Sequence, residues 1–173
     1  ITVGDVGVLS IESAESDAMT FRVGENTAGY GELYIESVSG SRLHIPDAFK
    51  YLEAGVISSV TPDSGQYGTL VTVVGENLFG IGGTSLSSIT LSGVESAQVI
   101  GSSSDEIVLV PGHADESSGF ATGDLPATSD VVITSDTGAI VYLTNGWTYL
   151  PEGKMFAVFP NSGTVGTRVG ISG

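Results

Sequence analysis

The sequence predicts an all-β fold of short strands, and three observations support this prediction. Glycine is abundant, with 25 residues in 173, and Val, Ile, Ser and Thr are frequent, as expected of short strands joined by tight turns. Apolar residues alternate with Thr in Val71-Thr72-Val73, which is the period of two of a half-buried strand. The chain also repeats itself, because Pro62-Asp63-Ser64-Gly65 returns 98 positions later as Pro160-Asn161-Ser162-Gly163. No long amphipathic helix is evident, and the best candidate, 46–52, is too short.

Turn residues divide the middle of the chain into segments of strand length. The expected strands are 56–61, 69–74, 88–91, 97–101, 106–110, 130–134 and 139–149. The turns between them, such as 62–65 and 135–138, are rich in Gly, Pro, Asp and Ser, which pre-set a turn or accept positive φ. The one long loop is the acidic stretch 112–129. Seven short strands with a turn about every ten residues predict a two-sheet sandwich of the immunoglobulin type.

The two ends of the repeat fall inside a module. Tyr51-Leu52 returns as Tyr149-Leu150, and Ile1-Thr2-Val3 matches Ile89-Thr90-Leu91 in the middle of the chain. The first stretch therefore corresponds to the back of a module and the last stretch to the front of one. The expected domains are an incomplete sandwich that lacks its first two strands (1–52), a complete module (53–150) and the first two strands of a further module (151–173).

The middle module resembles the IPT/TIG domain family. The resemblance rests on Val60-Thr61-Pro62-Asp63-Ser64-Gly65, on Gly68-Thr69 at the start of the second strand, and on Gly75-Glu76-Asn77-Leu78-Phe79. Trp147-Thr148-Tyr149 is also similar to the aromatic last strand of that family. The resemblance implies tandem immunoglobulin-like sandwiches of the kind found in cell-surface and secreted proteins and in some transcription factors. It does not fix a function, because this fold hosts many.

The composition of the chain limits the kinds of partner it is expected to bind and the place where it is expected to act. The net charge of −15 argues against binding to nucleic acid or to an anionic membrane surface. No cysteine is present, so neither a disulfide nor a thiolate metal site is expected. No apolar run is long enough to cross a bilayer, which predicts no membrane insertion. The chain begins with Ile1 rather than Met, as expected of a processed product or of a piece of something longer, and we expect a location outside the cell or on its surface.

Little in the sequence suggests catalysis, and we expect neither an enzyme nor a cofactor. His44 lies in a strand-like run, where an ordinary side chain is the simpler interpretation. The spacing of His113, Asp115 and Glu116 is compatible with a metal ion, but no second His or compact acidic motif supports such a site. Trp147 and Tyr149 alternate in the last strand and are expected in the core. Three further tyrosines are expected at the surface, without forming a row: Tyr30, Tyr34 and Tyr67.

The two partial modules together predict self-assembly. A sandwich without its first two strands exposes an apolar groove and strand edges, and a strand pair of the missing type follows at the other end of the chain. Head-to-tail contacts of this kind do not close on themselves and give a filament, so the main hypothesis is an extracellular fibre subunit. The expected donor residues are Phe156, Val158, Val169 and Ile171. The expected acceptor groove is lined by Val8, Met19, Phe21, Leu33, Ile35 and Leu43.

Two alternatives stay open at this point. The chain could be one stretch of a long tandem-repeat protein, in which the same modules are joined covalently. It could also be an adhesive or glycan-binding module, with the loop 112–129 as its contact, because loops that differ between copies of a module often carry binding.

Overall fold

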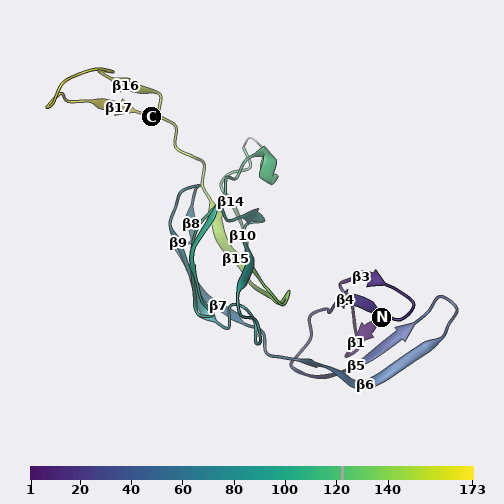
Figure 1. The fold of residues 1–173 in the computed structure, drawn as a ribbon. Coiled ribbons are helices and arrows are strands. Elements are labelled where there is room, and N and C mark those ends of the chain that lie inside the picture. Colours follow the sequence, from purple (N-terminus) through teal and green to yellow (C-terminus); the bar gives the residue numbers. More distant parts are fainter. Residues whose placement is uncertain (122) are drawn as a thin grey trace. The chain divides into compact units, whose positions relative to one another are not determined.

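The computed structural model describes residues 1–121 and 123–173 and confirms the predicted all-β class (Figure 1). In these ranges the helical structure is a single 3₁₀ turn, η1 (Glu116–Ser118). The candidate helix 46–52 is instead almost entirely strand. The chain divides into two compact units, Ile1–Gly55 (unit 1) and Val56–Gly173 (unit 2).

Unit 2 contains a two-sheet sandwich, here called the central sandwich, that runs from β7 to β15. One sheet has the order β11-β10-β14-β15-β8 and the other the order β12-β13-β9-β7. Its strands are β7 (Val56–Thr61), β8 (Ser64–Gly65), β9 (Val71–Glu76), β10 (Leu86–Leu91), β11 (Val94–Glu95), β12 (Gln98–Ser102), β13 (Glu106–Val110), β14 (Ala127–Ser135) and β15 (Ile140–Tyr149). This is the predicted immunoglobulin-like sandwich.

The structure adds two short strands to the seven expected ones, and the limits of five expected strands shift by one to three residues. The strands β8 and β11 have only two residues each, so they carry no periodicity that a sequence could reveal. Strand β14 begins at Ala127, inside the expected loop 112–129. Its first residues are small and polar, yet they pair with the aromatic end of β15, with Ala127 opposite Tyr149 and Ser129 opposite Trp147.

The core of the central sandwich lies between its two sheets. Val71 and Val73 are fully buried and alternate with Thr72, which is partly exposed. Trp147 and Tyr149 are buried with their rings edge to face and centroids 5.7 Å apart, which confirms their predicted core position. The other buried core residues are Ile57, Val60, Leu78, Phe79, Ile89, Leu91, Val94, Ile107, Leu109, Val131, Ile133 and Val141.

Unit 1 repeats the pairing pattern of the second part of the central sandwich. It contains a sheet of order β2-β1-β5-β6 and a separate hairpin of β3 and β4. Its strands are β1 (Thr2–Val3), β2 (Val6–Gly7), β3 (Ser10–Ala14), β4 (Met19–Arg22), β5 (Gly29–Glu36) and β6 (Arg42–Tyr51). They correspond in order to β10, β11, β12, β13, β14 and β15, and the described residues of unit 1 form no counterpart of β7, β8 or β9.

The registers of the corresponding strand pairs coincide. In unit 1, Leu33 pairs with Ile45 after an irregularity that follows Gly31, and β14 pairs with β15 with the same irregularity at the equivalent position. The β3–β4 hairpin, with Ile11 opposite Phe21, likewise repeats the register of β12 and β13 and its bulge. Both copies therefore follow one backbone plan.

Beyond the central sandwich, the C-terminal hairpin consists of β16 (Ala157–Phe159) and β17 (Gly170–Ser172). Val158 pairs with Ile171. The residues 98 positions earlier, Val60 of β7 and Val73 of β9, pair in the same way. The hairpin therefore has the register of the first strand pair of the central sandwich.

The turns of these two hairpins also agree. Thr164 N donates to Thr167 Oγ1 at 2.9 Å, and Gln66 N donates to Thr69 Oγ1 at 3.1 Å. In each turn, the residue before the Thr is a glycine with φ in the left-handed region, 92° at Gly166 and 86° at Gly68.

Candidate functional site

Both histidines of the chain belong to the same kind of group, in which a His and a Tyr ring stack beside a carboxylate. In unit 1, the rings of Tyr34 and His44 stack with centroids 4.3 Å apart and planes 8° from parallel. Glu32 accepts a hydrogen bond from the Tyr34 hydroxyl at 2.6 Å and lies 3.2 Å from His44 Nε2. That hydrogen bond from Tyr34 lowers the pKa of Glu32 and raises the pKa of Tyr34. We call these three residues the β5–β6 cluster.

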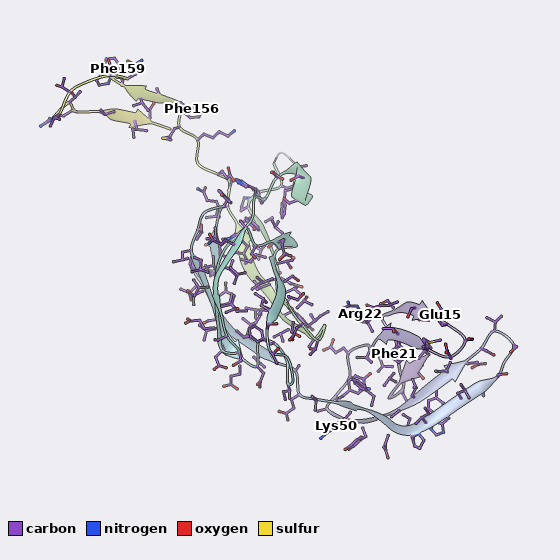
Figure 2. The ribbon with its side chains drawn as sticks, viewed as in Figure 1. Glu15, Phe21, Arg22, Lys50, Phe156 and Phe159 are labelled. Carbon is purple, nitrogen blue, oxygen red and sulfur yellow. The ribbon has the colours of Figure 1, made fainter. Side chains whose placement is uncertain are left out.

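The pairing of β5 with β6 positions this cluster. Tyr34 lies directly opposite His44, and alternation along β5 places Tyr30, Glu32 and Tyr34 on one face of the sheet. Tyr30 and Tyr34 are 68% and 39% exposed. The Lys50 ammonium, on β6 (Figure 2), lies 5.6 Å from the centroid of the Tyr30 ring. Tyr30 and Tyr34 therefore share one face of the sheet.

A polar cleft of about 320 Å³ opens beside the β5–β6 cluster. It is lined by Gly4, Asp5, Asn26, Thr27, Ala28, Gly29, Tyr30, Glu32 and Tyr51. Asn26 Nδ2 donates to the carbonyl of Gly4 at 2.8 Å and so joins the two loops that form the walls. Glu32 belongs to both the cleft and the cluster, so a ligand in the cleft would reach this carboxylate.

A second group of the same kind lies at one end of the central sandwich. The rings of Tyr67 and His113 stack with centroids 3.6 Å apart and planes 18° from parallel, and His113 Nδ1 lies 3.0 Å from Glu152 Oε1. Gln66 Oε1 accepts a hydrogen bond from Gly153 N at 3.1 Å. We call Tyr67, His113 and Glu152 the loop cluster, because His113 stands at the start of the predicted binding loop.

The side chains around His113 and Asp115 do not support the metal site considered for this loop. His113 faces Glu152, whereas Asp115 accepts hydrogen bonds from Ser117 and from the backbone of Ser118. The Ser117 hydroxyl is the main cause of the lowered pKa of Asp115. No group of three or more His, Cys, Asp or Glu in the described residues could hold a metal ion.

The predicted acceptor residues line one side of unit 1. Phe21 on β4 (Figure 2), together with Val8, Leu33 and Ile35, is half-buried, and Met19 and Leu43 are exposed. The counterparts of Met19, Phe21, Leu33, Ile35 and Leu43 in the central sandwich are all buried, namely Ile107, Leu109, Val131, Ile133 and Val141. We call this side, with its partly covered apolar residues, the inner face of unit 1.

The predicted donor residues are exposed as well. Phe156, which is labelled in Figure 2, and Val158 lie at β16. Val169 and Ile171 lie at β17 of the C-terminal hairpin. Val60, Val71 and Val73, the counterparts of Val158, Val169 and Ile171, are buried. Phe156 instead corresponds to Ser58, which is exposed, and Met155 corresponds to the buried Ile57.

No helix in the described ranges is long and apolar enough to cross a membrane.

The two packed sheets, their short strands and the buried aromatic pair of β15 define an immunoglobulin-like sandwich domain. The model of the IPT/TIG domain family matches residues 56–147, which is more than half of the chain. The chain therefore belongs to the IPT/TIG family, as its first strands and turns predicted.

Comparison with known proteins adds two solved structures. One is the SGBP-B protein of the mixed-linkage glucan utilization locus of Bacteroides ovatus in complex with a mixed-linkage heptasaccharide, with 16% identity and a TM-score of 0.38. The other was solved with a xylogluco-oligosaccharide and has 17% identity and a TM-score of 0.40. The matches cover 86% and 83% of this chain but only 36% and 29% of those chains. No curated protein sequence matches.

Proposed function

We propose that this chain is a non-catalytic segment of a cell-surface TIG-repeat protein and that it binds glycans. The observation that carries the proposal is the exposed Tyr–His–Glu group, which occurs in both units and uses both histidines of the chain. A flat ring offers an apolar surface for a sugar ring, and a carboxylate accepts hydrogen bonds from its hydroxyls. A few placed polar groups beside aromatic surface are typical of ligand sites.

The β5–β6 cluster has the more complete site of the two. It borders the polar cleft, and Tyr30 and Lys50 extend the same face with a second ring and a hydrogen-bond donor. The interleaved charges of Glu32 and Lys50 suit an uncharged, hydroxyl-rich ligand better than a polyanion. The net charge of −15 disfavours polyanions in the same way.

Binding is tested with mixed-linkage glucan and xyloglucan oligosaccharides as probes, by calorimetry on the full chain. The Tyr34→Ala variant should lose affinity by roughly fivefold, since an aromatic contact contributes about 1 kcal/mol. Tyr67→Ala measures the loop cluster in the same way. Tyr142→Ala is the matched control, because Tyr142 is an exposed tyrosine on β15 outside both clusters. Binding that survives both cluster variants unchanged would refute this site assignment.

A second candidate function is a structural one, as a fibre subunit that assembles head to tail by strand complementation. The observation that favours it is the agreement in register between the C-terminal hairpin and the β7–β9 pair, the pair that has no counterpart in unit 1. Electron microscopy of the full chain should then show filaments, and deletion of residues 154–173 should leave monomers. Filaments that persist without those residues would exclude this mode of assembly.

A further inference from the structure

We propose that the face of the sheet that carries the β5–β6 cluster binds an extended, uncharged oligosaccharide that lies along β5. The inference rests on the proposed glycan binding and names the class of ligand, a chain of more than two sugars without acidic groups. Three features support it: two tyrosine rings spaced along one strand, a polar cleft with fixed walls beside one of them, and two carboxylates that line this cleft.

This face of the sheet points away from the core, and the second sheet of a sandwich does not cover it. The equivalent face of the central sandwich belongs to β14 and β15, where Val132 lies opposite Tyr142 as Tyr34 lies opposite His44. Tyr142 is 51% exposed there, because the second sheet covers the other face. The exposure of Tyr30 and Tyr34 is therefore a property of the sandwich plan.

The two tyrosine rings are too far apart for one sugar. Tyr30 and Tyr34 are four positions apart on β5, which corresponds to about 13 Å along the strand. A sugar ring is similar in size to a tyrosine ring, so a single sugar can contact only one of them. A ligand that contacts both rings must be a chain, with one sugar at each tyrosine and at least one more between them.

The polar cleft fixes where one end of this chain lies. A hairpin turn of Gly4 and Asp5, both with positive φ, forms part of its wall, together with Tyr30 and Glu32 of β5. Gly4 N donates to the carbonyl of Glu32 at 2.8 Å, and the Asn26 side chain donates to the carbonyl of Gly4. The walls are thus tied together before a ligand binds, as is typical of ligand sites, and a sugar on Tyr30 can place its hydroxyls in the cleft.

Two carboxylates in the cleft favour uncharged sugars. Asp5 and Glu32 both line it. Glu32 Oε2 accepts the hydrogen bond from Tyr34 and lies beside His44 Nε2, and no hydrogen bond to Glu32 Oε1 occurs within the described residues. Oε1 can therefore accept a hydrogen bond from a sugar hydroxyl, whereas an acidic sugar would bring a third negative charge to the two carboxylates.

The central sandwich shows that the shared strand plan does not require these side chains. The positions of Asp5, Tyr30 and Tyr34 are taken there by Gly93, Thr128 and Val132. The counterpart of Glu32 is Asp130, whose Oδ1 accepts a hydrogen bond from Asn145 N at 2.9 Å. The two rings and the free carboxylate oxygen are thus particular to unit 1.

The length of the ligand tests the inference by calorimetry. The full chain carries Tyr67→Ala, so that the loop cluster does not contribute, and the probes are mixed-linkage glucan fragments from disaccharide to hexasaccharide. The affinity should rise at least fivefold from the disaccharide to the tetrasaccharide. Tyr34→Ala should remove this gain and leave the disaccharide affinity unchanged, whereas Tyr30→Ala should lower both affinities. Tyr142→Ala is the matched control and should change neither.

The charge of the ligand is tested with an oligosaccharide of four uronic acids. It should bind at least tenfold more weakly than the neutral tetrasaccharide. Asp5→Asn should reduce this difference, since Asn keeps the size of the side chain and tolerates the positive φ of 66° at this position. Equal affinities for the neutral and the acidic chain would contradict the assignment of Asp5 and Glu32 to the site.

The outcomes separate this inference from the proposed function. Length-dependent binding that only Tyr34→Ala makes independent of length supports the extended site. Equal affinities for disaccharide and tetrasaccharide would overturn the extended site and leave glycan binding in place. Absence of binding in the Tyr67→Ala protein alone would also overturn it, because only the loop cluster would then bind. Absence of binding in the unsubstituted chain as well would overturn both the inference and the proposed function.

Discussion

Unit 1 and the central sandwich share a strand plan but differ in how completely their side chains are covered. Val131 on β14 is fully buried, whereas its counterpart Leu33 on β5 is only half-buried, although the two strands pair in the same register. The central sandwich adds β7, β8 and β9, and these strands close its core. Register is therefore encoded locally in each hairpin, while burial depends on the facing sheet.

A side-chain truncation at the same place in both units gives the largest expected contrast. Trp147→Ala should destabilise the central sandwich by about 3–5 kcal/mol, because the indole is fully buried. The counterpart Phe49→Ala should cost about 1 kcal/mol or less in dilute solution, since this ring is 41% exposed. Chemical denaturation followed by hydrogen exchange in each unit measures both costs.

Protein concentration sharpens that contrast. If second copies cover the inner face of unit 1, the cost of Phe49→Ala should rise with concentration, while the cost of Trp147→Ala should not, because binding adds its free energy to the folded state. Equal costs for the two substitutions at low concentration would mean that unit 1 has a closed core of its own.

Removal of one methylene is a finer version of the same comparison. Ile133→Val should destabilise the central sandwich by about 1 kcal/mol, and Ile35→Val should change unit 1 by less than about 0.5 kcal/mol. The β-branched shape is kept in both cases, so strand propensity does not enter the difference. Thermal unfolding with a probe in each unit measures the shifts, and an Ile35 effect as large as that of Ile133 would contradict the difference in burial.

The sequence predicts the strands and the repeat well because both are local patterns. The alternation in Val71-Thr72-Val73 is enough to predict a half-buried strand. The 98-residue repeat is found by comparing the sequence with itself, without knowing which residues are in contact. The β5–β6 cluster could not be predicted, because it depends on the register that places His44 opposite Tyr34 across an irregular ladder. His113 and Tyr67 come together only through the folding of the whole sandwich.

The smallest expected effect concerns a loop contact that only the central sandwich has. Thr84 donates from its backbone and from its hydroxyl to the Asp136 carboxylate, at 3.1 and 2.6 Å, and the counterpart of Asp136 in unit 1 is Val38, an exposed residue. The Thr84 hydroxyl is the main cause that holds the pKa of Asp136 below its ordinary value of 3.8.

A carboxylate with a lowered pKa stabilises the fold at pH values above its unfolded pKa, and this contribution is lost as the pH falls through the folded pKa. The central sandwich should therefore lose slightly more stability below about pH 4 than its Asp136→Asn variant does, while the unfolding of unit 1 should be the same in both proteins. Melting curves at pH 3 and pH 7, recorded with one probe in each unit, measure the difference. Exposed carboxylates elsewhere titrate in the same way in both proteins, so they do not contribute to the difference. Identical pH dependence of the central sandwich in both proteins would therefore show that the Thr84–Asp136 contact does not stabilise this loop.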